Sequence, residues 1–218
     1  MTLADDYQDR FVTALSPIAE ALEQQLRSYL SEESHIDRIS ARAKSVDRFL
    51  SKAEKLVDGV VKYSDPLNQI QDQVGARVIT FYVSDIETIS KVIENYYRLV
   101  ETRTIVPDSE WEFGYFGKHY ILLLPRDVID PGIDQNLVPE FFELQVKTLF
   151  QHAWSEANHD LGYKPGAAPL TADEKRRLAF TAAQAWGADR VFDELYQGRA
   201  RLATSDTNEP DSRLRSVV

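Results

Sequence analysis

The stretch Phe142-Glu143-Leu144-Gln145-Val146-Lys147-Thr148 decides the fold of this chain. At a period of two residues, Phe142, Leu144 and Val146 fall on one face, and Glu143, Gln145 and Lys147 fall on the other. This alternation predicts a β-strand that packs its apolar face into a core. The polar face, taken alone, is typical of an edge strand that faces solvent. A carboxylate, an amide and an ammonium in a row would equally suit a binding site.

Length and composition bound the class of protein. The 218 residues are 43% hydrophobic and 28% charged, which predicts a globular protein with one domain and some additional segments. The absence of cysteine excludes disulfides and thiolate metal sites and fits a reducing cytosol, so we expect a cytoplasmic protein. We find no secretory h-region near Met1 and no apolar run approaching ~18 residues, so neither secretion nor membrane association is expected.

The charge balance is acidic, with a formal net charge of −10 from 25 basic and 35 acidic residues. Such a balance argues against non-specific binding to nucleic acid through bulk charge. It leaves room for a local basic site that binds a polyphosphate.

A helical segment is predicted at the N-terminus, and another is predicted before the C-terminal tail. Residues 1–34 carry an apolar stripe at helical spacing, which would pack on the domain or on a second copy of the chain. Pro17 inside the stripe predicts either a kink or a second helix capped by Ser16. A capping box at Thr171–Glu174 predicts a helix over 171–197. Residues 198–218 are polar without a period, which predicts a disordered tail.

The basic part of the chain runs from Arg38 to Lys62. Ser45 is a candidate N-cap, and apolar spacing from Val46 to Val60 predicts the buried face of one helix. Three cations share the opposite face, which is typical either of a solvated surface or of a clamp for phosphates. They are Arg48, Lys52 and Lys55.

The remaining pattern predicts an α+β domain with one mixed sheet flanked by helices. Gly75 before a strand indicates a bend or a close backbone approach. The predicted segments, in order, are a turn at 65–68, a strand within 71–83, a helix over 85–97, a weaker strand over 99–106, a glycine-rich loop at 113–120, an apolar run at 121–124, a surface loop at 128–139 and a helix over 149–161.

One group of side chains resembles a zinc site. His152, Glu156 and His159 lie on one face of the predicted 149–161 helix, as zinc ligands might be arranged in a helix. Their spacing differs from the His-Glu-x-x-His pattern of metalloproteases. Packing and hydrogen bonding account for these residues better, so no metal is expected there.

Four short blocks occur in a fixed order within residues 36–165. They are Arg42-x-Lys44 with Lys52, Asp72-x-x-Gly75-x-Arg77, Gly114-Tyr115-x-x-x-His119 and Glu143-x-Gln145-x-Lys147-Thr148. Together they resemble the synthetase domain of the RelA/SpoT family, the (p)ppGpp pyrophosphokinases, whose fold is related to nucleotidyltransferases. The segment from Gln151 to Lys164 is similar to that of the single-domain members, the small alarmone synthetases.

The resemblance implies an activity and a set of roles. Members of this family transfer the β,γ-pyrophosphate of ATP to a ribose 3′-hydroxyl, here expected to belong to GDP or GTP, and release AMP with the help of Mg²⁺. By resemblance, Asp72 and Glu143 are metal ligands, and Glu143 alternatively takes the hydroxyl proton, with Arg77 as a further catalytic residue. The implied ATP-binding residues are Arg42, Lys44, Arg48, Lys52 and Arg77, and the implied acceptor-binding residues are Tyr115, Lys118, His119, Gln145 and Lys147.

The sequence also departs from the family pattern. Gly117 replaces a serine of the acceptor loop, Lys118 replaces an apolar residue, and Arg48 stands where serine is common. These departures keep open a toxin-type relative that modifies adenosine nucleotides or the 3′ end of tRNA, with an antitoxin protein as partner. An inactive nucleotide-binding module is a third interpretation, disfavoured because Asp72 and Glu143 are both present. The sequence leaves open whether the chain forms a homo-oligomer.

Overall fold

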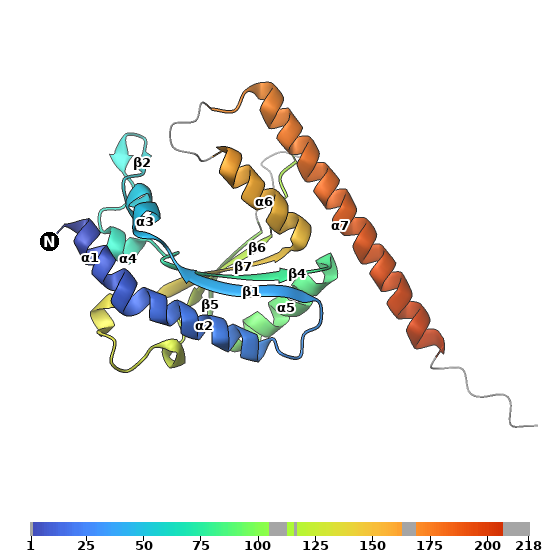
Figure 1. Ribbon diagram of the computed structural model, residues 1–218, viewed down its shortest axis with the longest axis horizontal. Coiled ribbons are helices and arrows are strands. Elements are labelled where there is room, and N and C mark those ends of the chain that lie inside the picture. Colours follow the sequence, from blue (N-terminus) through green and yellow to red (C-terminus); the bar gives the residue numbers. More distant parts are fainter. Residues whose placement is uncertain (1, 105–112, 116, 163–168, 207–218) are drawn as a thin grey trace, which may run out of the picture.

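A mixed sheet of five strands forms the middle layer of the molecule (Figure 1). This computed structural model describes residues 2–104, 113–115, 117–162 and 169–206. β4 and β7 pair in parallel, and the other neighbouring strands pair antiparallel. The fold class predicted from the sequence is therefore confirmed. In spatial order the strands are β1 (Ile36–Ala43), β4 (Val74–Thr80), β7 (Phe141–Thr148), β6 (Lys118–Leu123) and β5 (Leu99–Thr104).

β7 is the central strand of the sheet, and its apolar face is part of the main core. Phe142, Leu144 and Val146 are all 0% exposed, as the alternation predicts. Because β4 and β6 pair with β7 on either side, the edge-strand interpretation of its polar face is wrong. The polar face is covered in part by a helix and in part open to a pocket.

Helices cover both faces of the sheet (Figure 1). On one side lie α1 (Leu3–Arg10), α2 (Ser16–Tyr29) and α5 (Val83–Tyr96), whose buried apolar residues belong to the main core. The other side carries α3 (Val46–Ala53) and α6 (Leu149–Gly162). The short helix α4 (Pro66–Gln69) precedes β4, and two 3-10 turns, Arg126–Val128 and Gln135–Leu137, lie in the region of the predicted surface loop.

The N-terminal helix accommodates Pro17 without a break. A π-helical turn, Phe11–Leu15, joins α1 to α2, and Pro17 lies in the first turn of α2. The Ser16 hydroxyl donates to the Phe11 carbonyl at 2.8 Å instead of capping a new helix. A π turn and a side-chain hydroxyl therefore satisfy the backbone where proline interrupts the regular pattern.

The basic segment folds differently from the prediction. Residues Ile36–Ala43 form strand β1, which the sequence did not reveal, and α3 ends at Ala53 instead of continuing to Val60. Leu56–Val57 (β2) and Val60–Val61 (β3) pair as an exposed hairpin, so the expected buried face is wrong beyond Ala53. The hairpin turns at Asp58 and Gly59, whose φ angles are 51° and 79°. An Asp-Gly pair favours this two-residue turn because both positions need positive φ.

The long helix α7 (Ala172–Asp206) begins where predicted, with Thr171 and Glu174 forming reciprocal capping bonds. It passes along α6 and then extends beyond the sheet (Figure 1). The prediction of a disordered tail is wrong for residues 198–206, because helix propagation adds a backbone bond for each further residue. The rest of that tail lies outside the described residues. Within the described part of the chain, no helix is long and apolar enough to cross a membrane.

Candidate active site

The register of the sheet gathers the polar side chains on the face that carries α3 and α6. Neighbouring strands in register share a face, so residues far apart in sequence meet in two rows. One row runs Arg42, Gly75, Glu143, and the other runs Ser40, Arg77, Gln145, His119.

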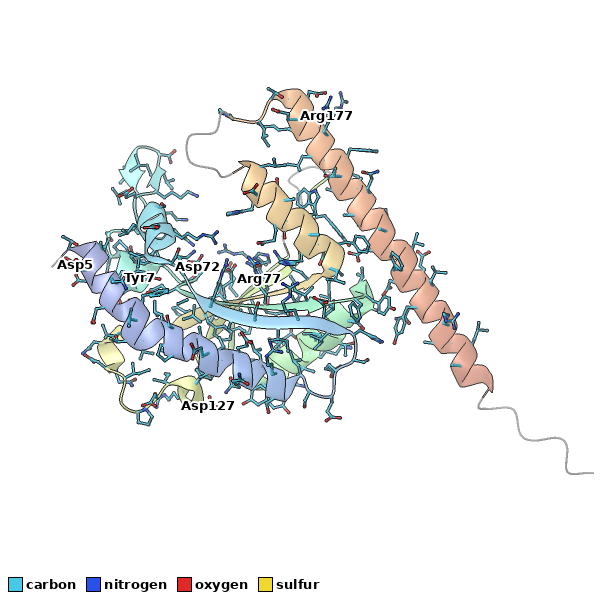
Figure 2. All side chains as sticks on the ribbon, in the orientation of Figure 1. Asp5, Tyr7, Asp72, Arg77, Asp127 and Arg177 are labelled. Carbon is cyan, nitrogen blue, oxygen red and sulfur yellow. The ribbon has the colours of Figure 1, made fainter. Side chains whose placement is uncertain are left out.

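All residues of the two rows except His119 line a cavity of about 240 Å³. Figure 2 shows two of its lining residues, Asp72 and Arg77, between α3 and α6 on the side of the sheet away from α2. Gly75 also lines the cavity, and a Cβ at this position would have nothing within 4 Å, so the glycine leaves space above the strand. The charged lining residues are Arg42, Lys44, Arg48, Asp72, Arg77 and Glu143.

Asp72 precedes β4 and is held by two lysines. Its Oδ2 lies 3.0 Å from the Lys44 Nζ and 2.9 Å from the Lys52 Nζ. Burial alone would raise the pKa of Asp72, but the two ammonium groups outweigh it and hold that pKa below its usual value. The other oxygen, Oδ1, is buried and has no hydrogen-bond partner in the described structure. An ionised carboxylate with one free oxygen is therefore available to a ligand.

Glu143 projects from β7 into the same pocket. Its Oε1 lies 3.2 Å from the His119 Nδ1, and its Oε2 accepts a bond of 3.2 Å from the Gln145 Nε2. Burial would raise the pKa of Glu143, but the hydrogen bond and charge of His119 lower it overall. Two further buried atoms beside it, the His119 Nε2 and the Gln145 Oε1, also lack a partner among the described residues. These atoms, beside the pocket, are available to hydrogen-bond with a polar ligand.

Three guanidinium groups meet beside these carboxylates. Partial burial lowers the pKa of Arg42, and the neighbouring Arg77 and Arg48 lower it further by charge repulsion. The Arg77 Nη1 is paired at 2.9 Å with Glu156 Oε1 on α6, so one carboxylate offsets only part of the positive charge. Such a cluster is suited to the spread negative charge of a polyphosphate.

Glu156 is a member of the site that the sequence analysis missed. It was assigned to packing with His152 and His159, whereas the structure turns it toward Arg77. Its position one helical turn after His152 was visible in sequence, but its partner on β4 was not. The described residues contain no group of three or more His, Asp or Glu side chains that would hold a metal ion.

The two carboxylates nevertheless fit Mg²⁺. Asp72 and Glu143 line one pocket, each has a pKa shifted toward the ionised form, and Asp72 keeps a free oxygen. Mg²⁺ in nucleotide sites is bound by one or two carboxylates and completes its shell with water and substrate phosphates. The donor set is therefore sufficient for the ion that the family resemblance implies.

Lys147 lies on the polar face of β7 but is covered by α6. It is 4% exposed, and its Nζ donates to the Ser155 Oγ at 3.2 Å. Burial lowers the pKa of Lys147 to about 8, with a further contribution from the charge of Arg77. Gly117 lies directly against it: a Cβ on Gly117 would overlap the Lys147 Cγ and the Val146 carbonyl oxygen. The serine common in the family therefore has no room here.

The structure does not bring Lys118 to the pocket, contrary to the prediction. It follows the strand alternation: His119 faces Glu143, whereas Lys118 faces α5 on the other side of the sheet. There its Nζ lies 3.4 Å from the Glu94 Oε1 and 5.1 Å from the centre of the Tyr120 ring. Adjacent residues of a strand point to opposite faces, so these two cannot serve one site.

Tyr115 also lies away from the pocket lining. The residue is 8% exposed, and it packs with Trp154 and Ala182 in a second apolar cluster between α6 and α7. Its hydroxyl donates to the Asp189 Oδ2 at 2.5 Å. Asp189, on α7, was not foreseen, because nothing in the local pattern of that helix distinguishes it from a surface carboxylate.

Comparison with known proteins agrees with this geometry. The family described as the region found in RelA / SpoT proteins matches residues 41–168 of this chain. The chain is 28% identical over 211 residues to the GTP pyrophosphokinase YjbM of Bacillus subtilis (strain 168), covering 91% of this chain and 92% of that protein.

Solved structures also share the fold. A GTP pyrophosphokinase family protein from Streptococcus pneumoniae matches with a TM-score of 0.71 at 21% identity, over 96% of this chain and 100% of that one. The small alarmone synthetase 1 of Bacillus subtilis, bound to its product pppGpp, matches with a TM-score of 0.70 at 23% identity, over 89% of this chain and 98% of that one. The family match covers more than half of the chain and spans the pocket residues from Arg42 to Glu143. The chain therefore belongs to the RelA/SpoT family.

Proposed function

We propose that this protein transfers the β,γ-pyrophosphate of ATP to the ribose 3′-hydroxyl of GDP or GTP, producing (p)ppGpp and AMP. The observation that carries the proposal is the meeting of Asp72 and Glu143 beneath a cluster of cations in one pocket. The name of the Bacillus relative, a GTP pyrophosphokinase, and the pppGpp bound to small alarmone synthetase 1 support a guanosine acceptor.

The cations of the pocket bind the polyphosphate. Arg42, Arg48 and Arg77 supply guanidinium groups from three elements, β1, α3 and β4, so they can contact different phosphates of one ATP. Glu156 holds the Arg77 side chain, which reduces the freedom that Arg77 would lose on binding. These fixed positive charges stabilise the charge that spreads over the phosphoryl oxygens as the transfer proceeds.

The transfer itself makes one bond and breaks one. The acceptor 3′-oxygen attacks the β-phosphorus of ATP, the bond from this phosphorus to the α,β-bridging oxygen breaks, and AMP leaves with that oxygen. Glu143 is the group that takes the hydroxyl proton, because it is ionised and lies in the pocket. His119 and Gln145 orient its two oxygens. Mg²⁺, held by Asp72 and Glu143, would neutralise phosphate charge when bound.

A guanosine mononucleotide is the preferred acceptor. The net charge of −10 does not favour the extensive phosphate contacts that a tRNA normally requires. Gly117 opens no additional space for another acceptor, since it packs against β7.

The test is a competition in one tube. The protein is incubated at fixed salt with ATP labelled at the γ-phosphate and equal concentrations of GDP, GTP, ADP and deacylated tRNA. We expect label on the guanosine nucleotides, with one AMP released for each transfer, and no transfer by the Glu143→Gln variant. Label on tRNA or on adenosine nucleotides would instead support the toxin-type function. Nucleotide binding without transfer to any acceptor would support an inactive binding module.

A further inference from the structure

A buried carboxylate on α7 joins three separate parts of the structure. Asp189 is 0% exposed, and its Oδ2 accepts bonds of 2.5 Å from both the Tyr115 hydroxyl and the Thr148 hydroxyl. Thr148 ends β7, and its Oγ1 accepts the backbone N–H of Gln151 at the start of α6. Asp189 thus connects α7 to the strand that carries Glu143 and to the loop that carries Tyr115.

This contact determines where the Tyr115 ring lies. The ring packs with Trp154 of α6 and Ala182 of α7, and it contributes nothing to the lining of the pocket. A tyrosine that stacks on a nucleotide base must expose one ring face. Tyr115 therefore cannot contact the acceptor base until its ring leaves the cluster and its hydroxyl leaves Asp189.

We propose that Asp189 is a positioning residue that holds Tyr115 in a withdrawn position, so that acceptor binding requires the Tyr115–Asp189 hydrogen bond to break. This inference rests on the proposed function, since it concerns access of the acceptor to that same site. It makes α7 a determinant of acceptor affinity, although α7 contributes no residue to the pocket lining.

The energetics favour the withdrawn position. A hydrogen bond to a carboxylate is stronger than one between neutral groups, and a buried charge that loses a donor is costly. The Asp189 Oδ1 already lacks a partner among the described residues, so release of Tyr115 would leave the Thr148 hydroxyl as the one remaining donor to this carboxylate within the described structure. When the competent state is a minor fraction of the population, the apparent affinity for the ligand falls by that fraction.

Tyr115→Phe separates the two roles of the side chain, because it removes the hydroxyl and keeps the ring. We expect its KM for GDP to fall about three- to tenfold while its KM for ATP is unchanged. Asp189→Asn keeps the shape and weakens the bond, so a smaller fall in the same direction is expected. Tyr115→Ala removes the ring and should raise the KM for GDP about tenfold.

Tyr97→Phe is the matched control for these variants. It removes another buried tyrosine hydroxyl, which donates to the Gln25 Oε1 at 3.0 Å away from the site.

Two outcomes would overturn the proposal while leaving the proposed function intact. One is pyrophosphate transfer by Tyr115→Phe with a KM for GDP equal to or above that of the wild type. The other is a Tyr115→Ala variant that behaves like Tyr115→Phe, because the ring would then have no part in acceptor binding.

Hydrogen exchange provides a readout that needs no catalysis. Without nucleotide, the amides of residues 113–115 and 117 should exchange faster in Tyr115→Phe than in the wild type or Tyr97→Phe. Equal exchange in all three proteins would overturn the withdrawn position. If exchange is faster as expected but no protein transfers pyrophosphate, the hydrogen bond to Asp189 is upheld as a restraint on Tyr115 and the proposed function fails.

Discussion

Asp72 and Glu143 are single side chains whose charge is maintained by neighbouring groups in a confined pocket. Because Asn and Gln preserve their shape and remove the charge, we expect Asp72→Asn and Glu143→Gln each to lower pyrophosphate transfer at least about 100-fold. The measurement is the initial rate with labelled ATP, alongside a melting curve to show that each variant is folded. Asp47→Asn, on the exposed side of α3, should behave as wild type. Transfer within twofold of wild type in either variant would remove that residue from the mechanism.

Lys52 and Lys55 provide a matched pair of cations. Lys52 reaches Asp72 at 2.9 Å, whereas Lys55 follows the end of α3 and is exposed. Lys52→Ala should therefore raise the KM for ATP about tenfold, and Lys55→Ala should change it less than twofold. Steady-state kinetics at saturating acceptor measures both. Small, equal changes in the two variants would mean that the cations of α3 form only a solvated surface.

Replacement of glycine by alanine should have different effects at Gly75 and at Gly117. A methyl group on Gly117 would overlap the Val146 carbonyl, whereas one on Gly75 would meet nothing and would project into the pocket. Gly117→Ala should lower the melting temperature by several degrees, since overpacking typically costs about 1–3 kcal/mol. Gly75→Ala should keep its melting temperature and bind ATP more weakly. Calorimetry and ATP titration distinguish the two, and equal melting temperatures would contradict the close contact at Gly117.

The sequence predicted some positions of side chains and missed others for identifiable reasons. Strand alternation correctly placed Glu143 and Gln145 on one face, and the same rule should have separated Lys118 from His119. Asp189 could not be predicted, because its partners on β7 and on the loop are fixed only by the packing of α7.

Helix α7 is attached to the sheet domain at more than one place along its length. Besides the contact at Asp189, the Asp193 Oδ1 accepts bonds from the Ser84 N–H at 3.0 Å and the Ser84 hydroxyl at 2.6 Å, at the start of α5. Asp193→Ala removes this cap from another helix and should cost about 1 kcal/mol, or about 2–4 °C in melting temperature. Glu194→Ala, at the next and exposed position, is the control and should melt as wild type. Identical melting of the two variants would show that the cap contributes no stability.

Elements were predicted well where their periodicity was strong. The helices α5 and α6 and strand β7 have regular apolar spacing and were found with nearly correct ends. Strand β1 was missed because Ile36–Ala43 contains three charged residues and few β-branched ones. The β2–β3 hairpin was read as helix because its valines happen to continue the spacing of α3, although Asp58-Gly59 was a turn signal.

The stability of the folded protein should respond to pH through Lys147. Its pKa is about 8 when folded and 10.5 in the reference state, so the unfolded chain binds more protons between these values. Stability from this group therefore rises as pH increases through that window, by about 2 kcal/mol between pH 7 and 9.5. In Lys147→Met this rise should be absent, whereas Lys91→Met, which replaces an exposed lysine, should retain it. Urea unfolding at several pH values measures the difference, and parallel curves for all three proteins would refute it.

The parallel pairing of β4 with β7 has a consequence for how activity is acquired during folding. These strands are neighbours in the centre of the sheet, but the chain between them forms α5, β5 and β6 before it returns. Pairing of such distant segments is slow, because the entropy of closing the intervening loop is lost before the contacts form. Asp72 and Glu143 approach one another only when that pairing is complete. A refolding chain should thus regain its helical signal first and its catalytic turnover last, so that every active molecule is one whose central strands have joined.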